Sequence, residues 1–236
     1  VLSSGFCRNG VYARSDLIAK RRLRVVSAAA ASQLGNKPPS HISTVLEHAS
    51  DSLVIMQLPT RIWTIGHSSR PWEDFLALLE SQSIELVADV RRFAGSRKHP
   101  QFSAERLPQL LAEAGIAYRP IPELGGRRKP SSTSTNTIWR NAAFRAYADH
   151  MATDEYQSGR RQLLEYAGRQ RTAILCSEAV WWRCHRSMIA DDLKAAGITV
   201  LHIMAANKAT EHPYTAAASI RKGRLFYGPA PSSTPP

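Results

Sequence analysis

Two acidic residues in this sequence stand where a carboxylate is costly. Asp89 and Glu178 each come directly after, or close behind, a run of apolar residues. Removing a carboxylate from water is expensive, so this placement favours a specific role for both. They could act as general acid and base, or they could hold the cations Arg91 and Arg186. We predict that Glu178 and Asp89 are catalytic, while a structural Asp–Arg clamp remains the alternative for Asp89.

A second cluster combines thiols with an imidazole. Cys184, His185 and Arg186 stand at the expected start of a helix, where free N–H groups and a cation favour an anion or a thiolate. Cys184 is therefore the third catalytic candidate, as a nucleophile, with simple packing as the alternative. Together with Cys176 the group also raises a zinc site, but Cys-x7-Cys-His lacks the close spacing of common zinc sites. We predict no metal and no cofactor.

The remaining candidates are side chains that would hold a substrate. Each follows an apolar segment, although a histidine or serine at such a place often only caps the next helix. The predicted substrate-binding residues are His67, Ser68, Arg91, Arg97, Cys176, His185 and Arg186. The basic run 127–129 could contact phosphates, or it could simply be solvated.

Segments of strand and helix pattern alternate along the chain and would position these residues. The expected strands are 61–66, 85–90, 117–121, 172–176 and 199–204, and the expected helices are 71–82, 103–114, 141–170 with a break near 153–154, and 185–196. This alternation predicts an α/β fold, a single compact domain with a mostly parallel sheet and helices on both faces. Ligands of such sheets bind beyond the carboxyl ends of the strands, so we expect the polar clusters to converge there.

The two ends of the chain differ from its centre. Residues 1–55 are rich in Ser, Ala and Arg without a sustained period, and residues 229–236 are rich in Pro and Ser. We predict that 1–55 is a disordered or wrongly assigned N-terminal extension, that 56–228 is the α/β domain, and that 229–236 is a disordered tail.

Charge and cysteine content limit the partners and the compartment. The 236 residues carry a formal net charge of +12, and residues 1–55 hold only 7 Lys/Arg and 3 Asp/Glu, so most of the basic excess belongs to the predicted domain. Such a balance favours nucleic acid or a phosphate-bearing small molecule as partner, with plain solubility as the alternative. No apolar run is long enough to cross a membrane, and three cysteines make no disulfide framework. We therefore expect a cytoplasmic protein with no membrane partner.

Several short motifs in a fixed order resemble the family called domain of unknown function 488 (DUF488). They are Thr64–Ser68, Asp89–Arg91, Gly115–Tyr118, Leu124–Gly126, Cys176–Glu178 and Cys184–Arg186. The likeness runs from Arg61 to His202, and Phe93–Gly95 departs from it where a proline is frequent. The resemblance implies the compact α/β fold and the site residues, and it implies no mechanism.

Three functions fit these observations. The first is an enzyme that acts on a nucleic-acid or nucleotide substrate. Its reaction would be of hydrolase or lyase type, because the sequence has no dinucleotide-binding or P-loop fingerprint. The second is a non-catalytic nucleic-acid-binding module that uses the same basic charge. The third is a thiol-dependent or metal-dependent protein centred on Cys176 and Cys184.

Overall fold

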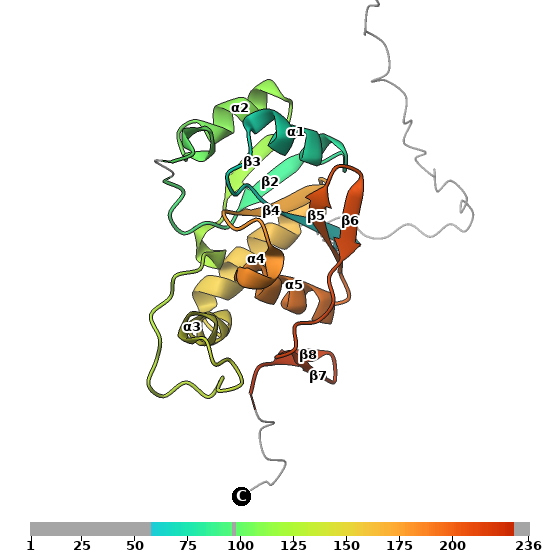
Figure 1. The fold of residues 1–236 in the computed structure, drawn as a ribbon. Helices are drawn as coiled ribbons and strands as arrows, with labels where there is room; N and C mark the ends of the chain where they lie inside the picture. Colours follow the sequence, from blue (N-terminus) through green and yellow to red (C-terminus); the bar gives the residue numbers. More distant parts are fainter. Residues whose placement is uncertain (1–57, 96–97, 229–236) are drawn as a thin grey trace, which may run out of the picture. The chain divides into compact units, whose positions relative to one another are not determined.

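The main sheet places its strands in an order that differs from their order in the sequence (Figure 1). Within residues 58–95 and 98–228, which the computed structural model describes, the order is β3-β2-β4-β1-β5-β6. The strands are β1 (Arg61–Gly66), β2 (Leu86–Asp89), β3 (Ala117–Pro120), β4 (Thr172–Cys176), β5 (Thr199–Ala205) and β6 (Lys208–Glu211). The first five run parallel, and β6 pairs with β5 in the antiparallel direction.

Helices cover both faces of this sheet (Figure 1). Two of them, α1 (Trp72–Glu80) and α2 (Leu107–Glu113), pack on one face, and α3 (Ala142–Met151), α4 (Asp154–Ala167) and α5 (Arg186–Ala195) pack on the other. Strand β1 serves both layers, because Trp63 and Ile65 join the core under α1 and α2 while Ile62 joins the core under α4 and α5. The described residues thus form a single α/β domain, and the predicted fold class is confirmed.

The predicted domain 56–228 is described from residue 58 onward. The predicted extension 1–55 and the predicted tail 229–236 lie outside the described residues. Among the described residues, no helix combines the length and the apolar character that a membrane crossing requires.

Side-chain caps fix where the two neighbouring helices α3 and α4 begin. Asn141 accepts a hydrogen bond from the N–H of Ala143 at the start of α3, and Thr153 accepts one from the N–H of Tyr156 at the start of α4. Such caps satisfy backbone donors that have no partner within the helix. The predicted break near 153–154 is therefore confirmed, and its cause is the cap at Thr153.

Strand β4 creates the position at which a ligand can enter. It lies between β1 and β2, with Gly66 opposite Cys176 and Asp89 opposite Leu175. The chain leaves β1 toward α1 on one face, whereas it leaves β4 through the short 3-10 helix η3 (Trp181–Arg183) toward α5 on the other face. Neighbouring strands whose connections diverge leave a crevice at their carboxyl ends. Cys176 stands in that crevice because it ends β4.

The C-terminal part of the domain contains strands that the sequence pattern did not predict. They are β6 and the separate hairpin of β7 (Ser219–Arg221) and β8 (Arg224–Phe226). The segment Lys208–Glu211 has no alternating apolar pattern, and its side chains are mostly exposed. It becomes a strand because the edge of β5 offers it backbone hydrogen bonds.

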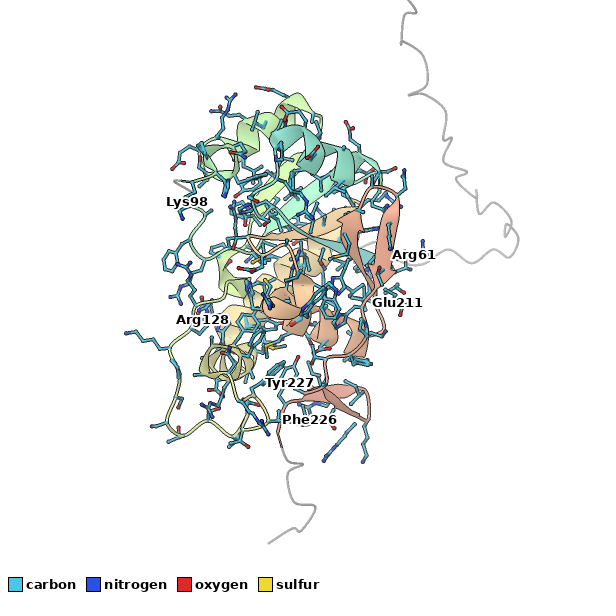
Figure 2. All side chains as sticks on the ribbon, in the orientation of Figure 1. Arg61, Lys98, Arg128, Glu211, Phe226 and Tyr227 are labelled. Carbon is cyan, nitrogen blue, oxygen red and sulfur yellow. The ribbon has the colours of Figure 1, made fainter. Side chains whose placement is uncertain are left out.

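A buried chain of hydrogen bonds joins this C-terminal part to the sheet. Thr64 Oγ lies 2.7 Å from Nδ1 of His202, and Nε2 of His202 lies 2.9 Å from Nδ1 of His212. Nε2 of His212 in turn lies 2.9 Å from a carboxylate oxygen of Asp191. Because a carboxylate only accepts, every donor in this chain points toward Asp191. Asp191 also accepts from the hydroxyl of Tyr227, just after the β7–β8 hairpin (Figure 2).

We expect acid to weaken the fold through His202. Burial, together with the neighbouring His212 and Arg186, lowers the pKa of His202 to about 2. The unfolded chain binds a proton at this imidazole below about pH 6.5, which the folded chain does not bind. The contribution of neutral His202 is therefore complete above pH 6.5 and is lost as the pH falls toward 2. Between pH 7 and pH 5 we expect a loss of about 1 to 2 kcal/mol from this residue.

Urea unfolding of the full chain at pH 7, 6 and 5 tests this expectation. His202→Gln removes the titrating group, so its free energy of unfolding should fall less steeply over this range than that of the wild type. Identical pH slopes for the two proteins would contradict the assignment.

Candidate functional site

The crevice at the carboxyl edge of the sheet contains a cavity of about 240 Å³. Its walls come from the loop after β2, the loop after the 3-10 helix η2 (Pro122–Leu124), helix α3, and the segment between β4 and α5. The arginines in these walls are Arg91, Arg92, Arg127 and Arg183. The cavity therefore concentrates positive charge over a small volume, which favours an anionic ligand.

A buried arginine organises the segment between β4 and α5. Arg186 is 1% exposed, and its Nη2 donates to the backbone carbonyl oxygens of Glu178 and Ala179 at 2.7 Å each. Gly66 makes this approach possible, since a Cβ at that position would overlap the carbonyl oxygen of Glu178. Burial lowers the pKa of Arg186, but a guanidinium keeps its proton. The loop 177–184 thus wraps around a fixed buried cation.

A buried ion pair shapes the neighbouring wall. Arg91 binds the carboxylate of Asp89 through Nε at 2.8 Å and Nη2 at 2.6 Å, and the hydroxyl of Tyr118 donates to the same carboxylate at 2.8 Å. The Nη1 of Arg91 donates to the carbonyl oxygen of Phe102 at 2.7 Å and lies 3.2 Å from Nε2 of His67. Asp89 is 1% exposed and lies beneath the cavity, so the clamp alternative describes its contacts.

His67 holds Arg91 from below the cavity. Burial lowers the pKa of His67 to about 4, against the raising effect of its hydrogen bond to Ser68. The neutral ring donates from Nδ1 to the carbonyl oxygen of Ser68 at 2.8 Å, so its Nε2 is free to accept from Arg91. Neither His67 nor Ser68 reaches the cavity wall.

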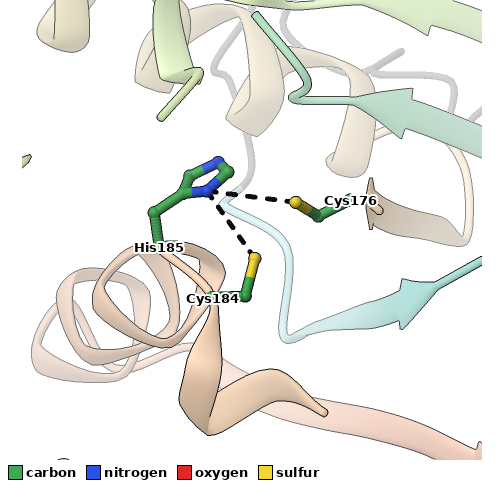
Figure 3. Close-up of side chains that lie close together, drawn as sticks. All are labelled: Cys176, Cys184 and His185. Carbon is green, nitrogen blue, oxygen red and sulfur yellow. Dashed lines mark hydrogen bonds between the residues drawn. The ribbon is translucent and has the colours of Figure 1, made fainter. Parts of the chain in front are cut away.

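Two thiols and one imidazole meet at the inner end of the cavity (Figure 3). The Nδ1 atom of His185 lies 3.9 Å from Sγ of Cys176 and 3.6 Å from Sγ of Cys184. Cys176 is placed by the end of β4, while Cys184 and His185 directly precede α5. Among the described residues, this is the one cluster of three or more cysteine, histidine or acidic side chains whose ligand atoms converge closely enough to hold a metal ion.

The surroundings of the two thiols shift their pKa values in opposite directions. A hydrogen bond from Cys184 holds the pKa of Cys176 well below its ordinary value, and the nearby His185 and Arg186 act in the same direction against the effect of burial. Burial raises the pKa of Cys184 well above its ordinary value, and the adjacent Cys176 sulfur raises it further. The two neighbouring thiols therefore titrate as an interacting pair and not as independent groups.

Two arginines of the basic run 127–129 have different surroundings. Arg127 is exposed and lines the cavity. Arg128, which is labelled in Figure 2, does not line the cavity. It donates to Glu155 at 2.8 Å and to the carbonyl oxygen of Gly125 at 2.9 Å. Arg128 therefore secures the loop, while Arg127 is available to an anion.

The predicted site residues separate into two layers. Those in the cavity wall are Arg91, Cys176, Glu178, Cys184 and His185. Those beneath or beside it are His67, Ser68, Asp89 and Arg186. Arg97 lies outside the described residues.

Glu178 is exposed, and no ion pair joins its carboxylate to Arg91 or Arg186 among the described residues. Glu178 lines the cavity, and its backbone oxygen, not its carboxylate, is the group that accepts from Arg186.

Sequence reasoning did not find the aromatic wall of the cavity. Phe144 and Tyr147 from α3 line it, and the Tyr147 ring lies 5.0 Å from the His185 ring. Their spacing on an amphipathic helix is that of ordinary core residues, so no signal in the sequence marked them. Phe93 lies two residues after the Asp89–Arg91 motif, is 65% exposed and lines the cavity, and it too was absent from the predicted site residues.

Comparison with known proteins gives one match. Residues 71–193 match the family described as "Domain of unknown function DUF488", a span somewhat narrower than the resemblance from Arg61 to His202. No curated protein and no solved structure matches the chain. The match covers more than half of the chain and includes every residue that lines the cavity. The chain therefore belongs to the DUF488 family.

Proposed function

We propose that this protein is an enzyme of hydrolase or lyase type that acts on a phosphate-bearing substrate, a nucleotide or a nucleic acid. One observation carries the proposal: the residues that line a single cavity include four arginines, the acidic Glu178 and a thiol–imidazole centre. The arginines suit phosphate, because each offers several fixed donors to its oxygens. A binding module needs the arginines but has no use for sulfur and imidazole donors at the inner end.

The size of the cavity limits what enters it. At about 240 Å³ it lies below the usual range for a drug-sized ligand, so it suits a phosphate with part of its sugar. The remainder of the substrate would extend over the rim, where the exposed ring of Phe93 offers a surface for stacking.

We assign a role to each site residue according to whether it lines the cavity or lies beneath it. Glu178 is the candidate general acid or base because it lines the cavity and its carboxylate has no ion-pair partner among the described residues. Cys176, Cys184 and His185 form the reactive centre, with Arg91 binding the substrate. Asp89, His67 and Arg186 act as positioning residues, since their polar atoms serve Arg91 or the loop 177–184.

We expect the exposed arginines of the cavity to govern binding of a nucleotide probe. Arg127→Ala and Arg92→Ala should each weaken the binding of a nucleoside monophosphate and of a short single-stranded DNA by about tenfold or more, or about 1.4 kcal/mol. Calorimetric titration at two salt concentrations measures the effect, and binding should weaken as salt rises.

Arg61→Ala is the matched control, because this exposed arginine starts β1 at the opposite end of the sheet. An equal loss in the Arg61 variant, or affinity independent of salt, would contradict the proposed site. Binding without turnover of any phosphate-bearing substrate would favour the non-catalytic nucleic-acid-binding module.

We expect Glu178 and Arg186 to differ sharply in their effect on stability. Glu178→Gln should leave the free energy of unfolding within about 0.5 kcal/mol of the wild type, because its side chain is exposed. Arg186→Met should lower it by about 2 kcal/mol or more, because two partly buried carbonyl oxygens lose their donor.

Chemical denaturation measures both values. If Glu178 is the acid–base group, Glu178→Gln should remove turnover of the phosphate substrate while the protein still binds it. A large loss of stability in Glu178→Gln would instead identify a structural carboxylate.

A further inference from the structure

We propose that Cys176, Cys184 and His185 bind a divalent ion of the zinc class, with the fourth position of the ion facing the cavity. The sequence alone raises a zinc site here as an alternative and predicts no metal, because the spacing of these residues is not that of common zinc sites. The proposal deepens the proposed function and rests on it only for what the ion would do, since binding of the ion is independent of any substrate.

The first support is the convergence of two sulfurs on one nitrogen. Sγ of Cys176 and Sγ of Cys184 lie 3.9 Å and 3.6 Å from the same Nδ1 atom of His185 (Figure 3). A ring nitrogen carries either one hydrogen or one lone pair, so it makes one good hydrogen bond and not two. Convergence of three donor atoms is the arrangement expected around a common ion.

The second support is the match of distances. Zinc binds sulfur at about 2.3 Å and histidine nitrogen at about 2.0–2.1 Å in tetrahedral geometry, which places a sulfur and a nitrogen ligand about 3.6 Å apart. The two distances to Nδ1 of His185 lie at or near this value, and all three donor atoms lie within 4.8 Å of one another. An ion therefore fits between them with small adjustments of the side chains.

The third support is the space left beside the nitrogen. A Cβ at Gly126 would lie 2.8 Å from Nδ1 of His185, so this glycine leaves the donor atom uncovered. All three donor residues and Gly126 also line the cavity. Three protein ligands with one position open to a pocket is the pattern of catalytic zinc, and structural zinc has four protein ligands.

Charge is compatible with an ion at this place. The buried guanidinium of Arg186 interacts with both thiols and would repel an isolated cation. Two thiolates cancel the two charges of the ion, so the complete centre is neutral and adds no repulsion. On the proposed function, water or a phosphate oxygen would occupy the fourth position, beside the arginines that bind the rest of the phosphate.

Titration of the full chain with zinc tests the proposal. Protein purified under reducing conditions and stripped of metal should bind one equivalent with Kd below about 1 μM in competition with a chromophoric chelator. Cobalt should give thiolate-to-metal charge transfer and the intense visible bands of a four-coordinate site. Binding weaker than this, or the weak bands of a six-coordinate cobalt ion, would overturn the proposal.

Variants identify the ligands. Cys176→Ser, Cys184→Ser and His185→Gln should each raise the Kd for zinc by about a hundredfold or more. Mutation of residues that only support the ligands of a metal site already lowers metal affinity by about tenfold to a hundredfold. Cys7→Ser is the matched control, because it makes the same change at the third cysteine and should keep one equivalent with unchanged Kd. Loss of the site in Cys7→Ser, or unchanged Kd in the other three, would overturn the assignment.

Two further measurements keep the outcomes separate. Gly126→Ala leaves all three ligands in place and should weaken zinc binding, so an effect there does not depend on removing a ligand that the fold might need. Nucleotide binding by Arg127→Ala is measured on the same preparations. If the protein binds zinc but Arg127→Ala does not change nucleotide binding, only the proposed function is contradicted. If Arg127→Ala weakens nucleotide binding but the protein does not bind zinc, only the metal site is contradicted.

Discussion

The guanidinium of Arg186 is buried, and its need for acceptors determines the shape of the site. It obtains them from the backbone of Glu178 and Ala179, which forces the loop after β4 to fold back over the start of α5. Only a glycine at position 66 allows that approach. The same loop brings Cys184 back to Cys176, so the thiol–imidazole centre follows from satisfying one buried cation.

Arg91, the second buried cation, supports the opposite wall of the cavity through an ion pair with Asp89. Arg91 is neutralised by Asp89, and its Nη1 group is used by Phe102 and His67. Arg186, in contrast, has carbonyl acceptors and no carboxylate partner among the described residues. The positive charge of Arg186 is therefore less compensated, and it contributes to the lowered pKa of the Cys176 thiol.

The loop after β4 is also held from its far side. Trp181 stacks on His202 with ring centroids 4.4 Å apart, and His202 belongs to the hydrogen-bonded chain that ends at Asp191. The C-terminal hairpin thus supports a site to which it contributes no residue. Rigid support of this kind suits the proposed catalysis, because reactive groups act only when they are held close to their productive geometry.

The sequence by itself determined the alternation of strands and helices, the caps and breaks between them, and the placement of polar residues after the strands. These features are local, because a period of two or of 3.6 residues and a capping side chain act within a few positions. The motifs were also sufficient to identify the family.

Only the tertiary structure decided that β4 lies between β1 and β2, and hence that Cys176 meets Cys184 and His185. It also decided that Glu178 serves Arg186 through its backbone oxygen and not through its carboxylate. The same holds for the aromatic wall from α3. These outcomes depend on contacts between residues that are far apart in the sequence. Such contacts decide the order of the strands and whether a buried donor binds a side chain or a backbone oxygen. They produce no repeating pattern in the sequence from which they could be predicted.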